Sequence, residues 1–269
     1  GIDPACNGKI PYEEARQALM RLIVRLLDTV VDAWLLVIIL ATMAFGAYSL
    51  WDNQNIYHEA DASVYKIYDP SAEEENGEDG LEKLRALNPD VVAWLRIDDT
   101  KINYPVVQGE DNNQYLNTNA VGEYSLAGSI FLDYRNEADF SSLNSIAYGH
   151  HMAQDIMFGQ LDEYRERTFF DTHRTGTLYF DCAWHDITFF AFLKADAHDK
   201  VLYDPDLTEC GDADGFYSYL RSHAQYFEEI ELSSETRFLT LSTCCASGSP
   251  NDRYLLIGII EEEEAEYSE

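Results

Sequence analysis

A thiol and a guanidinium lie nine residues apart near the C-terminal end of the sequence. Cys244 ends a strand-like segment that starts at 237, and Arg253 directly precedes the apolar, β-rich run 254–260. A hairpin between these two segments would bring both side chains to one edge of a sheet. A cysteine there is a candidate nucleophile if a base or cation lies nearby, but a lone cysteine at a strand end is more commonly buried and inert.

Among the seven histidines, His150 has the position best suited to partner the thiol. It follows an apolar strand-like segment that ends in a glycine, which lets the backbone turn sharply. His151 comes next, and because successive strand residues face opposite sides, only one of the two can face Cys244. In a Cys–His–Arg set, the thiolate attacks, histidine protonates the leaving amine, and arginine stabilises the oxyanion. The residues therefore suggest acyl transfer at an amide carbonyl.

The remaining cysteines and acidic residues do not predict a metal site or any cofactor. The five cysteines lack C-x-x-C spacing, and their odd number argues against a full disulfide framework. Zinc is not expected, because adjacent Cys244 and Cys245 are poorly placed to bind one ion together and no second cysteine or histidine pair completes a site. Calcium is not expected, because the acidic clusters lie in a linker and a tail rather than in a spaced ligand loop. Cys245, next to the candidate nucleophile, is expected to point into the core, with an off-pathway disulfide as the alternative.

The net charge excludes one large class of partners. With 18 Lys+Arg against 49 Asp+Glu, the formal net charge is −31. Such a surface repels phosphate backbones, so we expect no nucleic-acid binding. The simplest interpretation is a solubilising surface, and cationic partners or bound cations are the alternative.

Residues 33–50 predict a membrane anchor. They contain no charged residue, and Trp34 and Trp51 flank them at the positions of the two membrane interfaces. A signal peptide and a buried core helix are less favoured alternatives. The positive-inside rule places the N-terminus in the cytoplasm and the large C-terminal part outside the cell, because the basic residues before the span are Lys9, Arg16, Arg21 and Arg25.

The segments on either side of the anchor complete a predicted domain organisation. Residues 1–32 form a cytoplasmic segment whose part 13–31 is an amphipathic helix or the start of the anchor helix itself. The anchor then covers 33–51, an acidic linker 52–80, a catalytic domain 81–260, and an acidic tail 261–269.

The catalytic domain is predicted to be mainly β. Short strands with turn residues between them indicate a sandwich or barrel. The expected strands are 91–97, 102–107, 128–132, 145–148, 176–180, 187–194, 238–243 and 254–260. Helices are expected at 81–87, 157–164 and 215–227.

Several segments in order resemble one known family. Thr240-Leu-Ser-Thr-Cys244 resembles the TLxTC signature of sortases, and Arg253 follows it at the start of the last strand. The resemblance to class B sortases extends over roughly residues 81–260, on the segments Asn88-Pro-Asp-Val-Val-Ala-Trp-Leu-Arg-Ile97, Tyr104-Pro-Val-Val-Gln-Gly109, Asp111-Asn-Asn-Gln-Tyr-Leu-Asn117, Gly128-Ser-Ile-Phe-Leu-Asp133 and Tyr148-Gly-His-His-Met152. The helix at 215–227, inserted before the last two strands, also fits that class.

The resemblance implies an eight-stranded β-barrel acting as a cysteine transpeptidase on a Gram-positive cell surface. Cys244 would be the nucleophile, His150 the general acid, and Arg253 the stabiliser of the oxyanion and substrate. It would also place a set of binding residues along the groove for the sorting signal: Asn112, Leu116, Tyr148, Ser242 and Thr243.

The implied substrates are surface proteins or pilins that carry a C-terminal sorting motif. The enzyme would cut the motif after threonine and hold the new C-terminus as a thioester, which an amine then resolves. That amine would belong to a peptidoglycan cross-bridge or to a pilin lysine. Two alternatives stay open: a cysteine hydrolase that uses water instead, and an inactive sortase-like binding or assembly protein.

Overall fold

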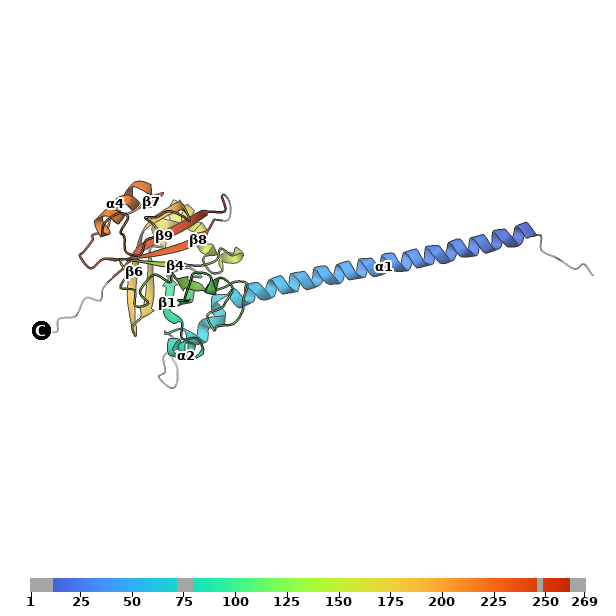
Figure 1. The fold of residues 1–269 in the computed structure, drawn as a ribbon, viewed down its shortest axis with the longest axis horizontal. Helices are drawn as coiled ribbons and strands as arrows, with labels where there is room; N and C mark the ends of the chain where they lie inside the picture. Colours follow the sequence, from blue (N-terminus) through green and yellow to red (C-terminus); the bar gives the residue numbers. More distant parts are fainter. Residues whose placement is uncertain (1–11, 72–79, 246–248, 262–269) are drawn as a thin grey trace, which may run out of the picture. The chain divides into compact units, whose positions relative to one another are not determined.

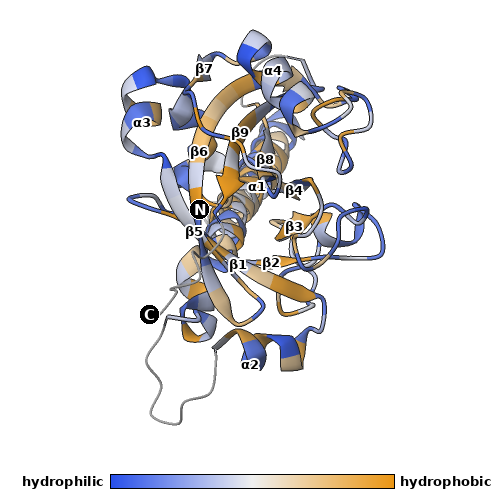
Figure 2. Ribbon diagram, turned by 90° about the vertical axis from the view of Figure 1, so that its left-hand side faces the viewer, coloured by the Kyte–Doolittle hydropathy of each residue, from blue (hydrophilic) through white to orange (hydrophobic). Residues whose placement is uncertain are grey.

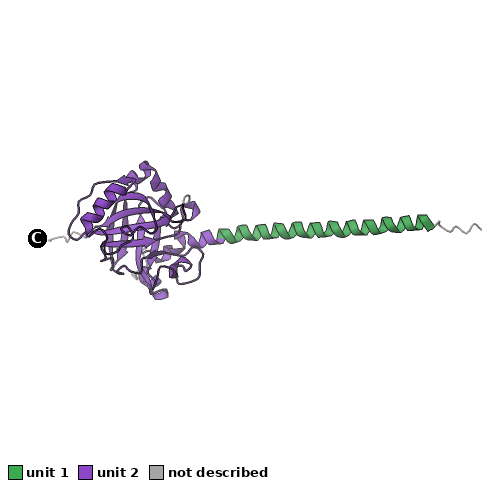
Figure 3. Cartoon of the chain, turned by 45° about the horizontal axis from the view of Figure 1, so that its top comes forward, with its two compact units in different colours: residues 1–54 green, residues 55–269 purple. Residues whose placement is uncertain are grey.

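The structure is a computed structural model that describes residues 12–71, 80–245 and 249–261. The chain divides into two compact units, residues 1–54 and residues 55–269, which are coloured separately in Figure 3. The acidic run 72–79 and the tail 262–269 lie outside the described residues, so the predicted acidic linker is described only in part and the predicted acidic tail stays a prediction.

The first unit contains most of one long helix. Helix α1 runs without interruption over Tyr12–Ala60, so the segment 13–31 is the beginning of the same helix as the apolar stretch. Most residues of this segment are strong helix formers, namely leucine, arginine, alanine, glutamate, glutamine and methionine. The side chains from 12 to 54 are exposed, and α1 is long and apolar enough to cross a membrane.

The second unit is built on a closed barrel (Figure 1). The strands follow the order β5-β1-β2-β3-β4-β8-β9-β6-β7, and β6 pairs back with β5, so eight strands close the barrel and β7 lies outside it. This confirms the predicted eight-stranded barrel. The strands are β1 Val91–Ile97, β2 Asn103–Val107, β3 Ile130–Leu132, β4 Asn144–Tyr148, β5 Thr175–Phe180, β6 Ala183–Asp196, β7 Tyr226–Phe227, β8 Arg237–Cys244 and β9 Asp252–Ile260.

Strand β6 buries both of its faces. Phe189 and Phe192 pack in the barrel core, whereas Phe190 and Leu193 belong to a second hydrophobic cluster that includes Phe216 of the inserted helix. The register of β6 against β9 shifts between positions 189 and 191, and such a bulge explains why the alternation of faces is broken there. Because both faces of β6 are buried, the predicted strand 187–194 is a nearly continuous apolar run in the sequence.

The inserted helix ends earlier than the sequence predicts. Helix α4 covers Ala213–His223, and its N-terminus is capped by the Asp212 side chain, which accepts a hydrogen bond from the Gly215 amide. Residues 226–227 were predicted to be helical, but they form β7 against β6. Next to this pair, the amide of Gln225 donates to the carbonyl of Phe192. The free edge of β6 thus takes up backbone that the aromatic pattern assigned to the helix. In Figure 2, the hydrophobic colour gathers on strands of the barrel, whereas many of the surrounding loops are hydrophilic.

Smaller helices complete the second unit. The helix predicted at 157–164 is a 3₁₀ helix, η4, over Gly159–Arg165. The unit begins at Asn55, within the predicted linker, because η1 (Ala62–Tyr68) packs on the barrel through the buried Tyr65. The other elements are α2 Gly80–Leu87, η2 Gln114–Leu116, η3 Ala153–Asp155 and α3 Arg167–Thr172.

Candidate active site

The thiol and the guanidinium face each other across two paired strands. β8 and β9 are antiparallel, and their register places Cys244 directly opposite Arg253. Directly opposite residues of an antiparallel pair present their side chains on the same face of the sheet. The Cys244 side chain is exposed at the end of β8. The hairpin expected from the sequence therefore brings these two groups together.

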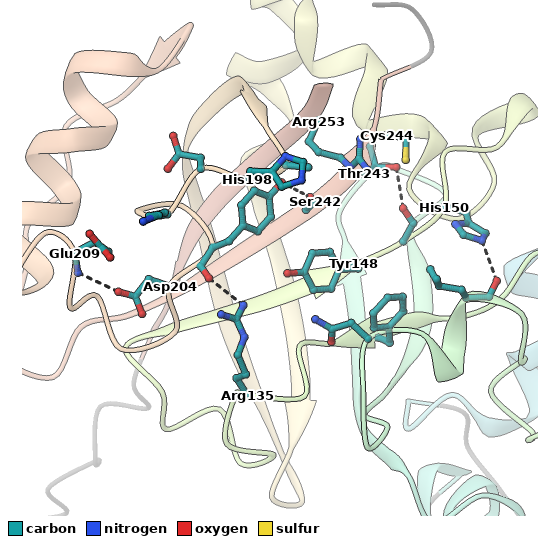
Figure 4. A pocket seen from close by; sticks show the side chains of 18 of the residues that line it. Arg135, Tyr148, His150, His198, Asp204, Glu209, Ser242, Thr243, Cys244 and Arg253 are labelled. Carbon is teal, nitrogen blue, oxygen red and sulfur yellow. Dashed lines mark hydrogen bonds between the residues drawn. The ribbon is translucent and has the colours of Figure 1, made fainter. Parts of the chain in front are cut away.

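The chain before His150 is fastened to the chain before Cys244. β4 runs parallel to β8, with Tyr148 beside Ser242. Beyond the end of β4, the amide of Gly149 donates to the carbonyl of Ser242 at 3.1 Å, and the hydroxyl of Thr243 donates to the carbonyl of Gly149 at 2.9 Å. These bonds bring the two strand ends together, and Figure 4 shows His150 and Cys244 at the same end of one cavity.

A backbone carbonyl holds the imidazole of His150. Its Nε2 lies 3.0 Å from the carbonyl oxygen of Leu116, at the end of η2. Because a carbonyl oxygen can only accept, Nε2 carries the proton in this bond. The other ring nitrogen, Nδ1, is therefore the atom that can gain or lose a proton during a reaction. The sequence placed Leu116 on the binding groove but did not predict this contact.

The loop between β8 and β9 anchors the guanidinium of Arg253. Its Nη1 donates to the carbonyl of Pro250 at 2.8 Å and to that of Asp252 at 2.9 Å. The carboxylate of Asp252 pairs with Lys194 of β6 at 2.7 Å and accepts from the amide of Ser249 at 2.9 Å. The residue before the arginine is thus tied to the barrel wall through Lys194, which limits how far the guanidinium can move from the thiol.

All predicted site residues line a single cavity of about 660 Å³. This size is in the range of pockets that enclose small ligands or short peptide segments. The structure brings these residues together from β4, β8, β9 and the segment after β2: Asn112, Leu116, Tyr148, His150, Ser242, Thr243, Cys244 and Arg253.

Several polar groups on the cavity wall are hydrogen-bonded within the protein. The side-chain amide of Asn112 and the hydroxyl of Tyr148 both donate to Asp133, at 3.0 and 2.8 Å. The hydroxyl of Ser242 is hydrogen-bonded to that of Tyr203 at 2.9 Å. Three of the predicted binding residues therefore shape the cavity through internal bonds.

Part of the wall was not predicted from the sequence. The segment after β6 contributes Ala197, His198, Asp199, Lys200, Tyr203, Asp204, Thr208 and Glu209, and the segment after β3 contributes Arg135. The loop after β6 carries no recognisable motif. Arg135 lies two residues after the quoted segment that ends at Asp133, and this was the available signal for it.

Cys245 and His151 have surroundings different from those of their neighbours. Cys245 packs against the barrel core, as expected, and burial raises the pKa of its thiol. His151 lies 3.3 Å from the carboxylate of Asp162 on η4. Neither residue lines the cavity. Within residues 12–71, 80–245 and 249–261, no group of three or more His, Cys, Asp or Glu side chains is arranged to hold a metal ion.

A closed barrel with a thiol, an imidazole and a guanidinium around one cavity defines a class of proteins suited to thiol-dependent acyl transfer. Residues 95–260 match the family model of the sortase domain. The chain is 35% identical to sortase B of Listeria monocytogenes over 194 residues. This aligned stretch covers 71% of this chain and 78% of that protein.

Solved structures agree with these matches. A class B sortase of Streptococcus pyogenes involved in pilus biogenesis has a TM-score of 0.63 and 37% identity, over 70% of this chain and 100% of the other. A Staphylococcus aureus sortase B–substrate complex has a TM-score of 0.62 and 29% identity, over 68% and 85%. The chain belongs to the sortase family, and its relatives place it among the class B enzymes. It is a cysteine transpeptidase of a cell-surface family.

Gly128 tests the contact that holds His150. Its φ is +62°, and an added Cβ would lie 2.5 Å from the carbonyl oxygen of Tyr115 and 2.7 Å from that of Leu116, the partner of His150. Gly128→Ala is expected to lower kcat/KM about tenfold, because the Leu116 carbonyl must move away from the imidazole. Peptide-cleavage kinetics measure the loss of activity, and chemical denaturation measures the change in stability.

Gly122 supplies the matched control for that substitution. Its φ is +87°, but an added Cβ would meet nothing within 4 Å. Gly122→Ala should cost about 1–2 kcal/mol of stability from the left-handed backbone and leave kcat/KM unchanged. Equal activity of the two variants would show that the position of the Leu116 carbonyl does not matter for catalysis.

Proposed function

We propose that Cys244 is the nucleophile, His150 the general acid and Arg253 the oxyanion stabiliser of this sortase. The observation that carries the proposal is the cross-strand pairing of Cys244 with Arg253, with His150 at the same end of the cavity. An exposed thiol beside a fixed cation and an imidazole is the arrangement that nucleophilic acyl transfer needs.

The chemistry follows from these positions. The Cys244 thiolate attacks the carbonyl carbon of the threonine in a sorting motif, and the guanidinium of Arg253 stabilises the oxyanion that forms. Nδ1 of His150 then gives its proton to the leaving amine, and a thioester remains on the sulfur. An incoming amine attacks the thioester, His150 takes up the proton that this amine loses, and the thiolate departs.

We further propose that the substrates are surface proteins or pilins with a C-terminal sorting signal, which binds along Asn112, Leu116, Tyr148, Ser242 and Thr243. These side chains line the cavity that leads to the thiol, which supports their role in binding. The second substrate is an amine from a peptidoglycan precursor or a pilin lysine. The similarity to a class B sortase involved in pilus biogenesis supports the lysine.

The proposed location is the cell membrane, with a single span and the catalytic unit outside. Helix α1 supports this, because its apolar side chains, including Trp34 and Leu40, are exposed over many turns. The basic residues before the span support a cytoplasmic N-terminus. The proposed segments are 1–32 cytoplasmic, 33–51 anchor and 81–260 catalytic, with the linker from 52 to 80 partly folded onto the barrel and 261–269 as a tail.

An acceptor titration tests transpeptidation against hydrolysis. With a sorting peptide and increasing triglycine or a lysine-containing peptide, we expect ligated product to increase at the expense of the free acid, because an amine competes with water for the thioester. Mass spectrometry separates the two products. Production of free acid alone at millimolar acceptor would identify a hydrolase, and absence of any adduct on Cys244 would identify a binding protein.

A further inference from the structure

Asp133 is a fully buried carboxylate directly after β3, with 0% of its surface exposed. Its two oxygens accept five hydrogen bonds. Arg135 provides three of them, from its backbone amide at 3.0 Å, from Nε at 2.9 Å and from Nη2 at 2.8 Å. The others come from Nδ2 of Asn112 at 3.0 Å and from the hydroxyl of Tyr148 at 2.8 Å.

The three donor residues belong to different walls of the cavity. Asn112 lies in the segment after β2, Tyr148 ends β4, and Arg135 follows β3, and all three line the cavity, whereas Asp133 does not. A single carboxylate thus fixes three side chains that a ligand in the cavity would meet. In Figure 4, Tyr148 and Arg135 lie along the middle of the cavity, between the thiol end and the end formed by Asp204 and Glu209.

The network continues through Arg135 to the strand that carries the thiol. Nη2 of Arg135 also donates to the carbonyl of Tyr203 at 3.0 Å. The Tyr203 ring is stacked with that of Tyr148 at 6.2 Å, and its hydroxyl is hydrogen-bonded to Ser242, two residues before Cys244. Asp133 therefore connects the loop after β6 and the end of β8 to the opposite wall.

Electrostatics favours the ionised carboxylate with its donors in place. Burial alone would raise the pKa of Asp133, but the hydrogen bonds from Arg135, Tyr148 and Asn112 more than offset it and hold the pKa below its usual value. The carboxylate also raises the pKa of Arg135. A buried ion is tolerated only with its partners in place, and loss of one partner leaves the others unpaired. The carboxylate is consequently ionised at neutral pH and accepts bonds from all three side chains.

We propose that Asp133 is a positioning residue for substrate binding, which holds Asn112, Arg135 and Tyr148 in the arrangement that receives the acyl half of the sorting peptide. This rests on the proposed function. His150 must lie near the leaving amine and occupies one end of the cavity, so the acyl half extends the other way, past Tyr148 and Arg135. Preorganised walls lower the cost of ordering a bound peptide.

Asp133→Asn tests the proposal, because the amide keeps the shape of the carboxylate but replaces one acceptor oxygen by a donor. We expect KM for a sorting peptide to increase about tenfold and kcat to change less than threefold. Alkylation of Cys244 by iodoacetamide should keep its wild-type rate, since it needs no peptide binding. Tyr148→Phe, which removes one of the five bonds, should raise KM about threefold and keeps the test available if Asp133→Asn does not fold.

Asp69→Asn is the matched control. Asp69 is also a buried carboxylate, bonded to the guanidinium of Arg96 and the side-chain amide of Asn103, but it lies away from the cavity. Asp69→Asn should lower the melting temperature without changing KM for the sorting peptide. Unchanged KM in both Asp133→Asn and Tyr148→Phe, or alkylation that slows in parallel with turnover, would overturn the inference. Failure of the wild-type enzyme to process any sorting peptide would instead reject the proposed function.

Discussion

Cys244→Ala is expected to abolish both cleavage of a sorting peptide and formation of the amine-ligated product, with kcat falling by roughly 10⁴-fold or more. The loss is this large because alanine offers no atom that can carry the acyl group, so neither half-reaction has a path. The thiol is exposed at the end of β8, and its removal empties no core position. Peptide turnover and intact-protein mass of the acyl-enzyme measure the effect.

Two other cysteines provide controls of different kinds. Cys245→Ala changes the adjacent thiol, which packs against the core and whose pKa is raised by burial. It should retain turnover and lose some stability. Cys182→Ala changes an exposed thiol in the turn between β5 and β6 and should alter neither. Wild-type turnover in Cys244→Ala, or acyl-enzyme on Cys245, would overturn the assignment of the nucleophile.

The sequence predicted the barrel, and the residues it singled out for the site line one cavity, because both depend on local patterns. Alternating and apolar segments located the barrel strands, and glycine after an apolar strand pointed to His150. The two strand-like segments around Cys244 and Arg253 predicted that these residues share a sheet edge, which requires only that two neighbouring strands pair in register.

Features that depend on contacts between distant segments were not predictable in this way. The helix predicted at 215–227 extends too far at its C-terminal end, because residues 226–227 pair with β6 instead. No local signal in the sequence reports a free strand edge. The contact of His150 with the carbonyl of Leu116 joins residues 34 positions apart. Arg135 and Tyr203 are 68 positions apart, and only the closed barrel brings them to one cavity.

His150→Ala is expected to lower kcat/KM for a peptide substrate by about 10²–10⁴-fold, because an amine is a poor leaving group unless it is protonated as it departs. The structure supports this role through position. Nε2 is bonded to the Leu116 carbonyl, which leaves Nδ1 as the nitrogen that can transfer the proton. Steady-state cleavage of a sorting peptide measures the loss.

His151→Ala is the matched comparison, since it changes the same residue type one position along the chain. His151 faces Asp162 on η4 at 3.3 Å rather than the cavity. Its loss should cost about 1 kcal/mol of stability or less, in the range of partly exposed ion pairs, with activity within a few-fold of wild type. Equal losses of activity in the two variants would contradict the choice of His150.

A change of leaving group separates proton donation from a structural role of His150. With a thioester substrate, the departing thiolate needs no proton, so the deficit of His150→Ala should shrink to about tenfold or less. A general acid acts on the leaving group, whereas displacement of Cys244 by a disturbed loop would slow both substrates alike. The same large deficit on amide and thioester would therefore mean that His150 holds the strand ends in place, and that the proton comes from another group.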